Sequence, residues 1–162
     1  MINPGESRVT IVIAIPSFLR ARATASETST VGTIKAVATA NAMYSNQFQM
    51  FAGTLGALGG TAGTTATCAA FQSMDNNTIL AVSSGTFKGW TFTYTPTGTA
   101  IAPTSGPCSG VSGNPGFVIS AVPLNPSNGS RSFCTDESNT VHADSALSAP
   151  ATEAACETLP TL

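Results

Sequence analysis

The chain has 162 residues and a mass of 16.3 kDa, which is enough for one domain with a hydrophobic core. Only 9% of the residues are charged, against about 25% in an ordinary soluble domain, and the formal net charge is −2. This balance excludes a nucleic-acid binder that works through a clustered basic surface, and the 42% hydrophobic content excludes disorder by charge repulsion. Ser and Thr make up roughly a quarter of the chain, which suits a secreted protein, a glycosylated one or one covered by its own copies.

The most apolar part of the chain is the run Val9–Leu19, with the sequence VTIVIAIPSFL. It is well short of the roughly 20 residues that a helix needs to cross a bilayer. Pro16 interrupts the run, and no clear small-x-small cleavage site follows it directly. The pattern therefore predicts neither a membrane-spanning helix nor a secretory signal peptide.

The chain from Ser17 to about Phe48 is predicted to be helical. It is rich in Ala, contains no Pro, and its apolar residues recur at spacings of three, four or seven. The apolar stripe consists of Val31, Ile34, Val37, Tyr44 and Phe48, with Asn41 as its one polar residue. Glu27 and Lys35 are assigned to the opposite, polar side, where pairing between neighbouring copies is one interpretation.

A helix from Pro16 to Phe48 would be about 50 Å long. A globular head formed by the rest of the chain, with a radius of gyration of about 13 Å, cannot cover such a rod. We therefore expect part of the helix to project. A projecting apolar end needs a membrane or a partner.

The composition changes after Phe51, and the second part of the chain is predicted to form a short helix and four strands. The short helix falls within Cys68–Val82. The strand pattern is strongest in Gly85–Thr95, where aromatic and hydroxyl side chains alternate. The other strands are Phe117–Val122, Arg131–Thr135 and Asn139–Ala143, and their short connections favour an antiparallel meander. The predicted fold class is α+β, with residues 1–51 as an N-terminal segment and helical spine and residues 52–162 as the β-sheet head.

The four cysteines are predicted to form two disulfides. They are Cys68, Cys108, Cys134 and Cys156, and their wide spacing contains no CxxC motif for redox chemistry or zinc. Three pairings are possible, and we favour Cys68–Cys108 with Cys134–Cys156. The second pair would tie a C-terminal tail without evident secondary structure back to a strand. Four buried free thiols are the alternative.

Several segments resemble type IV pilins. The stretch Ile13–Arg22 (IAIPSFLRAR) resembles the end of the membrane-embedded part of a pilin spine, and it is the most specific of them. The likeness continues in Val31–Lys35 and Asn41–Tyr44, which resemble the continuation of that spine. Three further segments of this chain resemble loop and strand segments of acidobacterial-type pilins, namely Leu55–Gly60, Gly89–Tyr94 and Arg131–Asp136. The resemblance extends from about Val9 to Ala143.

The resemblance implies a major pilin-like subunit with the pilin fold, a long helical spine packed against a four-stranded antiparallel head. Such subunits polymerise helically into an extracellular fimbrium on a bacterial surface, which serves adhesion, motility, DNA uptake or biofilm formation. The partners would be identical subunits and the pilus assembly machinery, with a membrane only before assembly and no nucleic acid as primary ligand. The expected filament-core residues are Val9, Ile11, Ile13, Ile15, Pro16, Phe18 and Leu19.

The start of the chain departs from the pilin pattern. Gly5 is not followed by the apolar run with its Glu, and Glu6 lies too close to Pro16 to match that Glu. The apolar run is therefore expected to be truncated. Three explanations remain open: an incomplete reading frame, a separate short helical pilin chain that supplies the missing half-helix, or a shortened stem.

Two further functions remain as alternatives. One is a minor pilin or type II secretion pseudopilin, and the other is a secreted monomeric binding module. An enzyme is not expected, because His142 is the single histidine and no nucleophile-elbow motif is present. No catalytic, cofactor or metal site is predicted, since the acidic residues after Asp136 are interpreted as a turn rather than a calcium site. Asn76 and Asn128 begin sequons and are candidate glycosylation sites.

Overall fold

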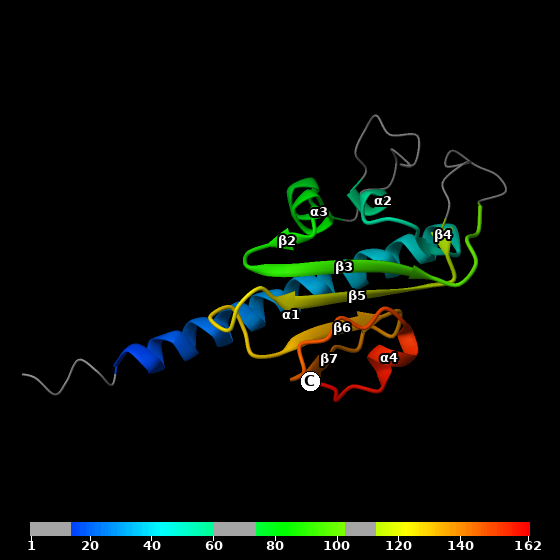
Figure 1. The fold of residues 1–162 in the computed structure, drawn as a ribbon. Helices are drawn as coiled ribbons and strands as arrows, with labels where there is room; N and C mark the ends of the chain where they lie inside the picture. Colours follow the sequence, from blue (N-terminus) through cyan, green and yellow to red (C-terminus); the bar gives the residue numbers. More distant parts are fainter. Residues whose placement is uncertain (1–13, 60–73, 103–112) are drawn as a thin grey trace, which may run out of the picture.

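The computed structural model describes residues 14–59, 74–102 and 113–162, which form one long helix, three short helices and two antiparallel sheets (Figure 1). The helices are α1 (Ala14–Phe48), α2 (Gly56–Gly59), α3 (Asn76–Ser83) and α4 (Glu153–Glu157). The strands are β1 (Phe51–Ala52), β2 (Thr86–Phe87), β3 (Trp90–Thr97), β4 (Gly113–Asn114), β5 (Gly116–Pro123), β6 (Ser132–Asp136) and β7 (His142–Asp144). The mixed α+β fold with antiparallel pairing agrees with the prediction.

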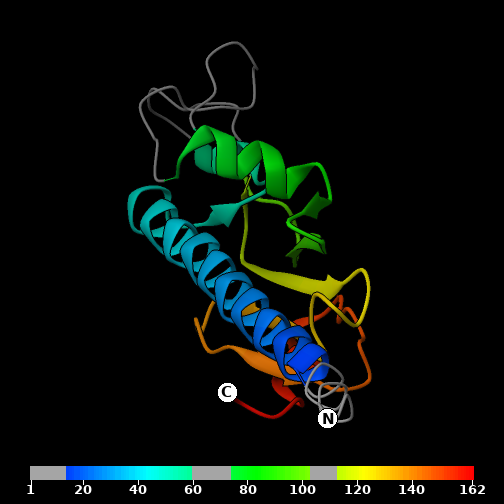
Figure 2. The same cartoon turned by 90° about the vertical axis from the view of Figure 1, so that its left-hand side faces the viewer.

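The predicted long helix is confirmed as α1, which has 35 residues. Its second half lies across the five-stranded sheet (Figure 2), and the apolar stripe faces the core, where Ile34, Val37 and Tyr44 are fully buried. The polar residue on the stripe, Asn41, is also fully buried. Its Oδ1 accepts a hydrogen bond from the backbone N–H of Ala52 at 3.1 Å, so it joins the helix to β1 and compensates for its own burial.

The larger sheet has five strands, in the order β2-β3-β5-β6-β7, rather than the predicted four. The run Gly85–Thr95 is broken by a tight turn at Lys88 and Gly89, whose φ angles are +50° and +83°. Two successive residues with positive φ match the right-handed twist of a two-residue hairpin. The turn places Phe87 opposite Trp90 and makes β2 a separate strand.

The alternation of β3 gives the sheet an aromatic face and a hydroxyl face. Trp90 and Phe92 are buried against the helical layer formed by α1, α2 and α3. Along the same face, the cross-strand register aligns Phe92 with Ala121 of β5 and Phe133 of β6. On the other face Thr93 lies beside Ser120. The buried face therefore supplies the main core of the molecule.

The C-terminal segment covers part of the hydroxyl face. The predicted Cys134–Cys156 disulfide is confirmed, and it joins β6 to α4 across 22 residues of sequence. The tail holds more secondary structure than expected, because Thr152 caps α4 by accepting a hydrogen bond from the N–H of Ala155. The predicted partner cysteines Cys68 and Cys108 lie outside the described residues. Within the described ranges, no helix combines the length and apolar character that a bilayer span requires.

Candidate functional site

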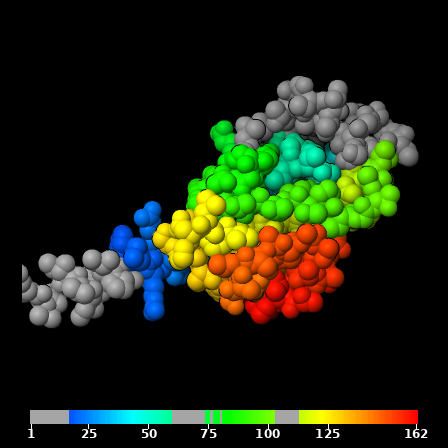
Figure 3. Space-filling view, in the orientation of Figure 1, coloured from blue at the N-terminus to red at the C-terminus, as the bar shows by residue number. Residues whose placement is uncertain are grey.

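The N-terminal end of α1 extends beyond the sheet and is solvent-exposed (Figure 3). We call residues 17–25 of this end the stem, because none of them is buried and Glu27 is the first buried side chain of the described helix. Two large apolar residues of the stem are open to water, with Phe18 67% and Leu19 46% exposed. They are the two large apolar side chains that the described part of the stem exposes.

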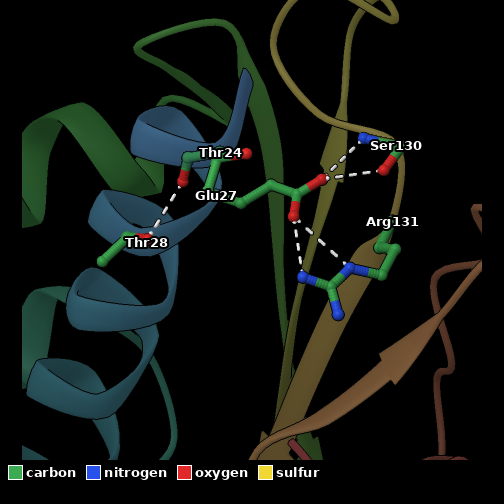
Figure 4. Close-up of polar contacts among 5 residues, drawn as sticks. All are labelled: Thr24, Glu27, Thr28, Ser130 and Arg131. Atoms are coloured by element: carbon green, nitrogen blue, oxygen red, sulfur yellow. Dashed lines mark hydrogen bonds and ion pairs between the residues drawn. The ribbon is translucent and has the colours of Figure 1, made fainter. Parts of the chain in front are cut away.

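Glu27 anchors α1 to the loop between β5 and β6 where the stem meets the head (Figure 4). One carboxylate oxygen accepts hydrogen bonds from the backbone N–H of Ser130 at 2.7 Å and from its hydroxyl at 3.1 Å. The other oxygen accepts from two guanidinium nitrogens of Arg131, at 2.8 Å and 3.3 Å. Such a two-pronged arrangement fixes both the distance and the direction between helix and loop.

The carboxylate of Glu27 is held in its charged form. Burial alone raises the pKa of Glu27, but the hydrogen bonds from Ser130 and Arg131, together with the charge of Arg131, lower it below its ordinary value. The assignment of Glu27 to the polar side of the helix is therefore wrong, since the side chain faces the sheet and is 7% exposed. Its ion pair is with Arg131 of the same chain, whereas Lys35 is exposed.

The loop that receives Glu27 is itself fixed to the head, and it coincides with the sequon Asn128-Gly129-Ser130. The amide nitrogen of Asn128 donates to the carbonyl of Gly89 at 2.8 Å. Gly129 lies so close to the ring of Trp90 that a Cβ there would be 2.7 Å from two ring carbons. The indole N–H of Trp90 in turn donates to the hydroxyl of Ser26 at 2.9 Å. Each residue of the sequon thus has a structural contact, and glycosylation of Asn128 stays a prediction.

Two grooves flank the Glu27 anchor. The larger, which we call the stem groove, has a volume of about 690 Å³ between α1 and the β5–β6 loop. Its walls are Leu19, Arg20, Ala23, Thr24, Glu27, Pro126, Ser127 and Ser130. The smaller, of about 200 Å³, lies on the other side of the anchor and includes Val31, Phe133 and Leu162. The stem groove therefore includes residues of the exposed stem as well as residues of the β5–β6 loop.

The other predicted filament-core residues are only partly described. Val9, Ile11 and Ile13 lie outside the described residues. Ile15 and Pro16 belong to α1, whose backbone is described there without their side chains. Asn76 begins α3, and its side chain is likewise not described. The described part of the predicted core surface is thus Phe18 and Leu19.

The acidic residues around the β6–β7 turn are not brought together. Asp136 is paired with Val118 at one end of β6, whereas Asp144 is paired with Ser132 at the other end. Among the described residues, no group of three His, Cys, Asp or Glu side chains is arranged to hold a metal ion. His142 is buried, and its Nδ1 lies 2.7 Å from the carbonyl oxygen of Leu159, so it takes part in packing the C-terminal segment.

The contact of Glu27 with Ser130 and Arg131 could not be predicted from the sequence, because these residues are distant from Glu27 in the chain. The one local signal is that Glu27 is the single acidic residue of α1. Comparisons with known proteins add no relative: no family model, curated protein or solved structure matches the chain. The site is therefore a helix end that exposes Phe18 and Leu19 and is joined through Glu27 to a head with a disulfide.

Proposed function

We propose that the chain is the structural subunit of a type IV pilus-like extracellular filament, and that it polymerises helically through the exposed end of α1. The observation that supports this most is the division of one continuous helix into two parts. The second half forms the core of the head, whereas the stem exposes Phe18 and Leu19. In this proposal, copies of the chain cover the stem.

The pilin fold is part of the proposal. A long N-terminal helix, most of it packed on an antiparallel sheet and its N-terminal end projecting, is the arrangement that the resemblance of IAIPSFLRAR to a pilin spine implies. Burial of the exposed parts of Phe18 and Leu19 would contribute about 2–3 kcal/mol per copy before the cost of association. Repetition along a filament multiplies this contribution, because every added copy buries its own stem.

Electron microscopy of filaments sheared from cells that produce the chain, with mass spectrometry of their protein, tests the proposal. We expect the wild-type chain as the abundant component of thin filaments. Replacement of both Phe18 and Leu19 by Ser should abolish these filaments without unfolding the head, because both side chains are exposed. Met43→Ser is the matched control, since Met43 is 51% exposed on the same helix but outside the stem.

Other results would contradict the proposal. A wild-type chain that stays monomeric at high concentration and is secreted without filaments would support a monomeric binding module. A chain that occurs in filaments only as a trace component would support a minor pilin or pseudopilin. Equal loss of filaments in the stem variant and in Met43→Ser would show that exposed apolar residues act without regard to their position.

A further inference from the structure

The loop between β5 and β6 contains the pair Asn128-Gly129, which is the single place in the chain where Gly follows Asn. An Asn side chain can react with its own backbone, because the amide nitrogen of the next residue attacks the side-chain carbonyl carbon. Gly hinders this attack least, since it has no Cβ beside the attacking nitrogen. By this criterion, the most reactive Asn of the chain lies in the loop that receives Glu27.

The reaction needs water and no other reagent. First, the backbone nitrogen of Gly129 forms a bond with Cγ of Asn128, and the bond between Cγ and Nδ2 breaks. The Nδ2 group leaves as ammonia with the proton that the backbone nitrogen loses, and a cyclic succinimide remains. Water then opens the ring at either carbonyl carbon. The product is aspartate or isoaspartate, and in isoaspartate the main chain runs through the former side chain and is one atom longer.

In the folded protein, the β2–β3 turn and Trp90 hold both reacting residues in place. Nδ2 of Asn128 donates to the carbonyl of Gly89 at 2.8 Å, and it is packed so closely that a Cβ on Gly89 would be 2.4 Å from it. Gly129 is buried, and a Cβ there would be 2.7 Å from the ring of Trp90. Loss of Nδ2 breaks the hydrogen bond to Gly89, and ring closure changes the backbone that packs against Trp90. The closed loop therefore opposes the reaction.

The contacts of α1 keep this loop closed. We use the name stem junction for the contacts of Ser26 and Glu27 with Trp90, Ser130 and Arg131, of which Figure 4 shows those of Glu27. The backbone N–H of Ser130, directly after Gly129, donates to Glu27 at 2.7 Å. The side chain of Glu27 also borders Gly129, because a Cβ on Gly129 would be 3.1 Å from its Cγ. Opening of the stem junction therefore frees the backbone next to the attacking nitrogen.

We propose that Asn128 is a self-modification site controlled by the stem junction: the succinimide forms when the junction opens, and its hydrolysis prevents the junction from closing again. Aspartate at position 128 places a carboxylate oxygen against the carbonyl of Gly89, where the amide now donates. Isoaspartate lengthens the main chain just before Ser130 and moves its N–H away from Glu27. The reaction needs no filament, so it is independent of the proposed assembly.

Peptide mapping of the full-length protein by mass spectrometry tests the protection by the fold. The purified wild type is incubated at mildly alkaline pH, once folded and once in urea, and aspartate and isoaspartate at position 128 are measured over time. We expect the folded protein to react at least about tenfold more slowly than the unfolded chain, because the reaction waits for a local opening. Equal rates in the two states would overturn the protection.

Variants of the stem junction test its control over the reaction. Folded Glu27→Gln should react at least about fivefold faster than the folded wild type, because the population of the open form sets the rate. Arg131→Gln is a second variant, which keeps the hydrogen bonds between Ser130 and Glu27, and circular dichroism checks that each variant is folded. Lys35→Gln, at an exposed position of the same helix, is the matched control and should react like the wild type. Equal rates in the wild type and in the folded junction variants would show that the junction does not control the reaction.

The single tryptophan of the chain reports the effect of the product on the junction. Trp90 is fully buried, and it contacts both Ser26 and Gly129. Asn128→Asp, which imitates one product, should shift the fluorescence of Trp90 to longer wavelength and increase its quenching by acrylamide. Asn46→Asp is the matched control, since Asn46 is exposed near the other end of α1, and it should leave the fluorescence unchanged. Wild-type fluorescence in Asn128→Asp would contradict the proposal, because the junction would then close over the product.

Discussion

At the scale of single residues, the stability of the stem junction depends on one buried carboxylate. Glu27 accepts four hydrogen bonds, from Ser130 and Arg131, and it is 7% exposed. A charged group in such a position is stabilised only as long as its donors remain in place. The Arg131 side chain is itself 44% exposed, so its charge alone contributes little, and the backbone hydrogen bond from Ser130 is the largest of the effects that lower the pKa of Glu27.

Replacement of Glu27 by Gln should lower the free energy of unfolding at pH 7 by about 1–3 kcal/mol, because one accepting oxygen becomes an NH2 group and the remaining hydrogen bonds lose their negatively charged acceptor. The pKa of Glu27 is lowered in the folded state, so its contribution is complete above the ordinary value of 4.5 and is lost as pH falls through the lower, folded-state value. Urea unfolding of both proteins between pH 7 and pH 3 should give curves that converge towards acid pH. Lys35→Gln, at an exposed position, should change stability by under about 0.5 kcal/mol at each pH, and parallel curves for Glu27→Gln would contradict the assignment.

At the scale of elements, close approach of the β5–β6 loop to the sheet requires a residue without a side chain. A Cβ at Gly129 would be 2.7 Å from the ring of Trp90 and 3.1 Å from the side chain of Glu27. By contrast, a Cβ at Gly32 of α1 would meet nothing within 4 Å. The same chemical change therefore has opposite expected effects at the two positions.

Gly129→Ala should lower the free energy of unfolding by about 1–3 kcal/mol through overpacking against Trp90. Gly32→Ala should raise it by about 0.5–1 kcal/mol, because Ala restricts the unfolded chain more than Gly and favours the helix. Thermal and urea unfolding of both variants, followed by circular dichroism, measures these changes. A Gly129→Ala protein as stable as the wild type would mean that the loop can move away from the ring.

Elements with a local periodic pattern could be predicted from the sequence, and contacts between distant segments could not. The helix α1 and the alternation of β3 follow from spacings within one segment. The turn at Lys88 and Gly89 escapes prediction, because Lys is not a typical residue for a positive φ, so the run looks like one strand. The partners of Glu27 follow it by 103 and 104 positions, and nothing near Glu27 indicates them.

At the scale of the whole molecule, the disulfide between Cys134 and Cys156 joins the C-terminal segment to the sheet. Val118 and both cysteines form a small second cluster on the face away from α1, with Leu159 packed against it. This cluster is small compared with the main core, so the covalent bond has a large share in keeping the segment in place.

Replacement of both Cys134 and Cys156 by Ala should lower the free energy of unfolding by about 3 kcal/mol, since the closed loop of 22 residues then adds its entropy to the unfolded state. The far-ultraviolet circular dichroism of the folded protein should change little, because α1 and β3 do not depend on this bond. Urea unfolding measures the difference, and the double substitution leaves the other two cysteines untouched. Complete loss of folded structure would instead mean that the head cannot form without the bond.

The continuity of α1 from the stem into the core has a mechanical consequence. Tension applied to the stem passes along the helix backbone and reaches the head first where Ser26 and Glu27 contact Trp90, Ser130 and Arg131. These bonds leave two consecutive residues of the helix, so they share the load in parallel. We therefore expect this junction to be the first part of the head that resists a pull on the stem.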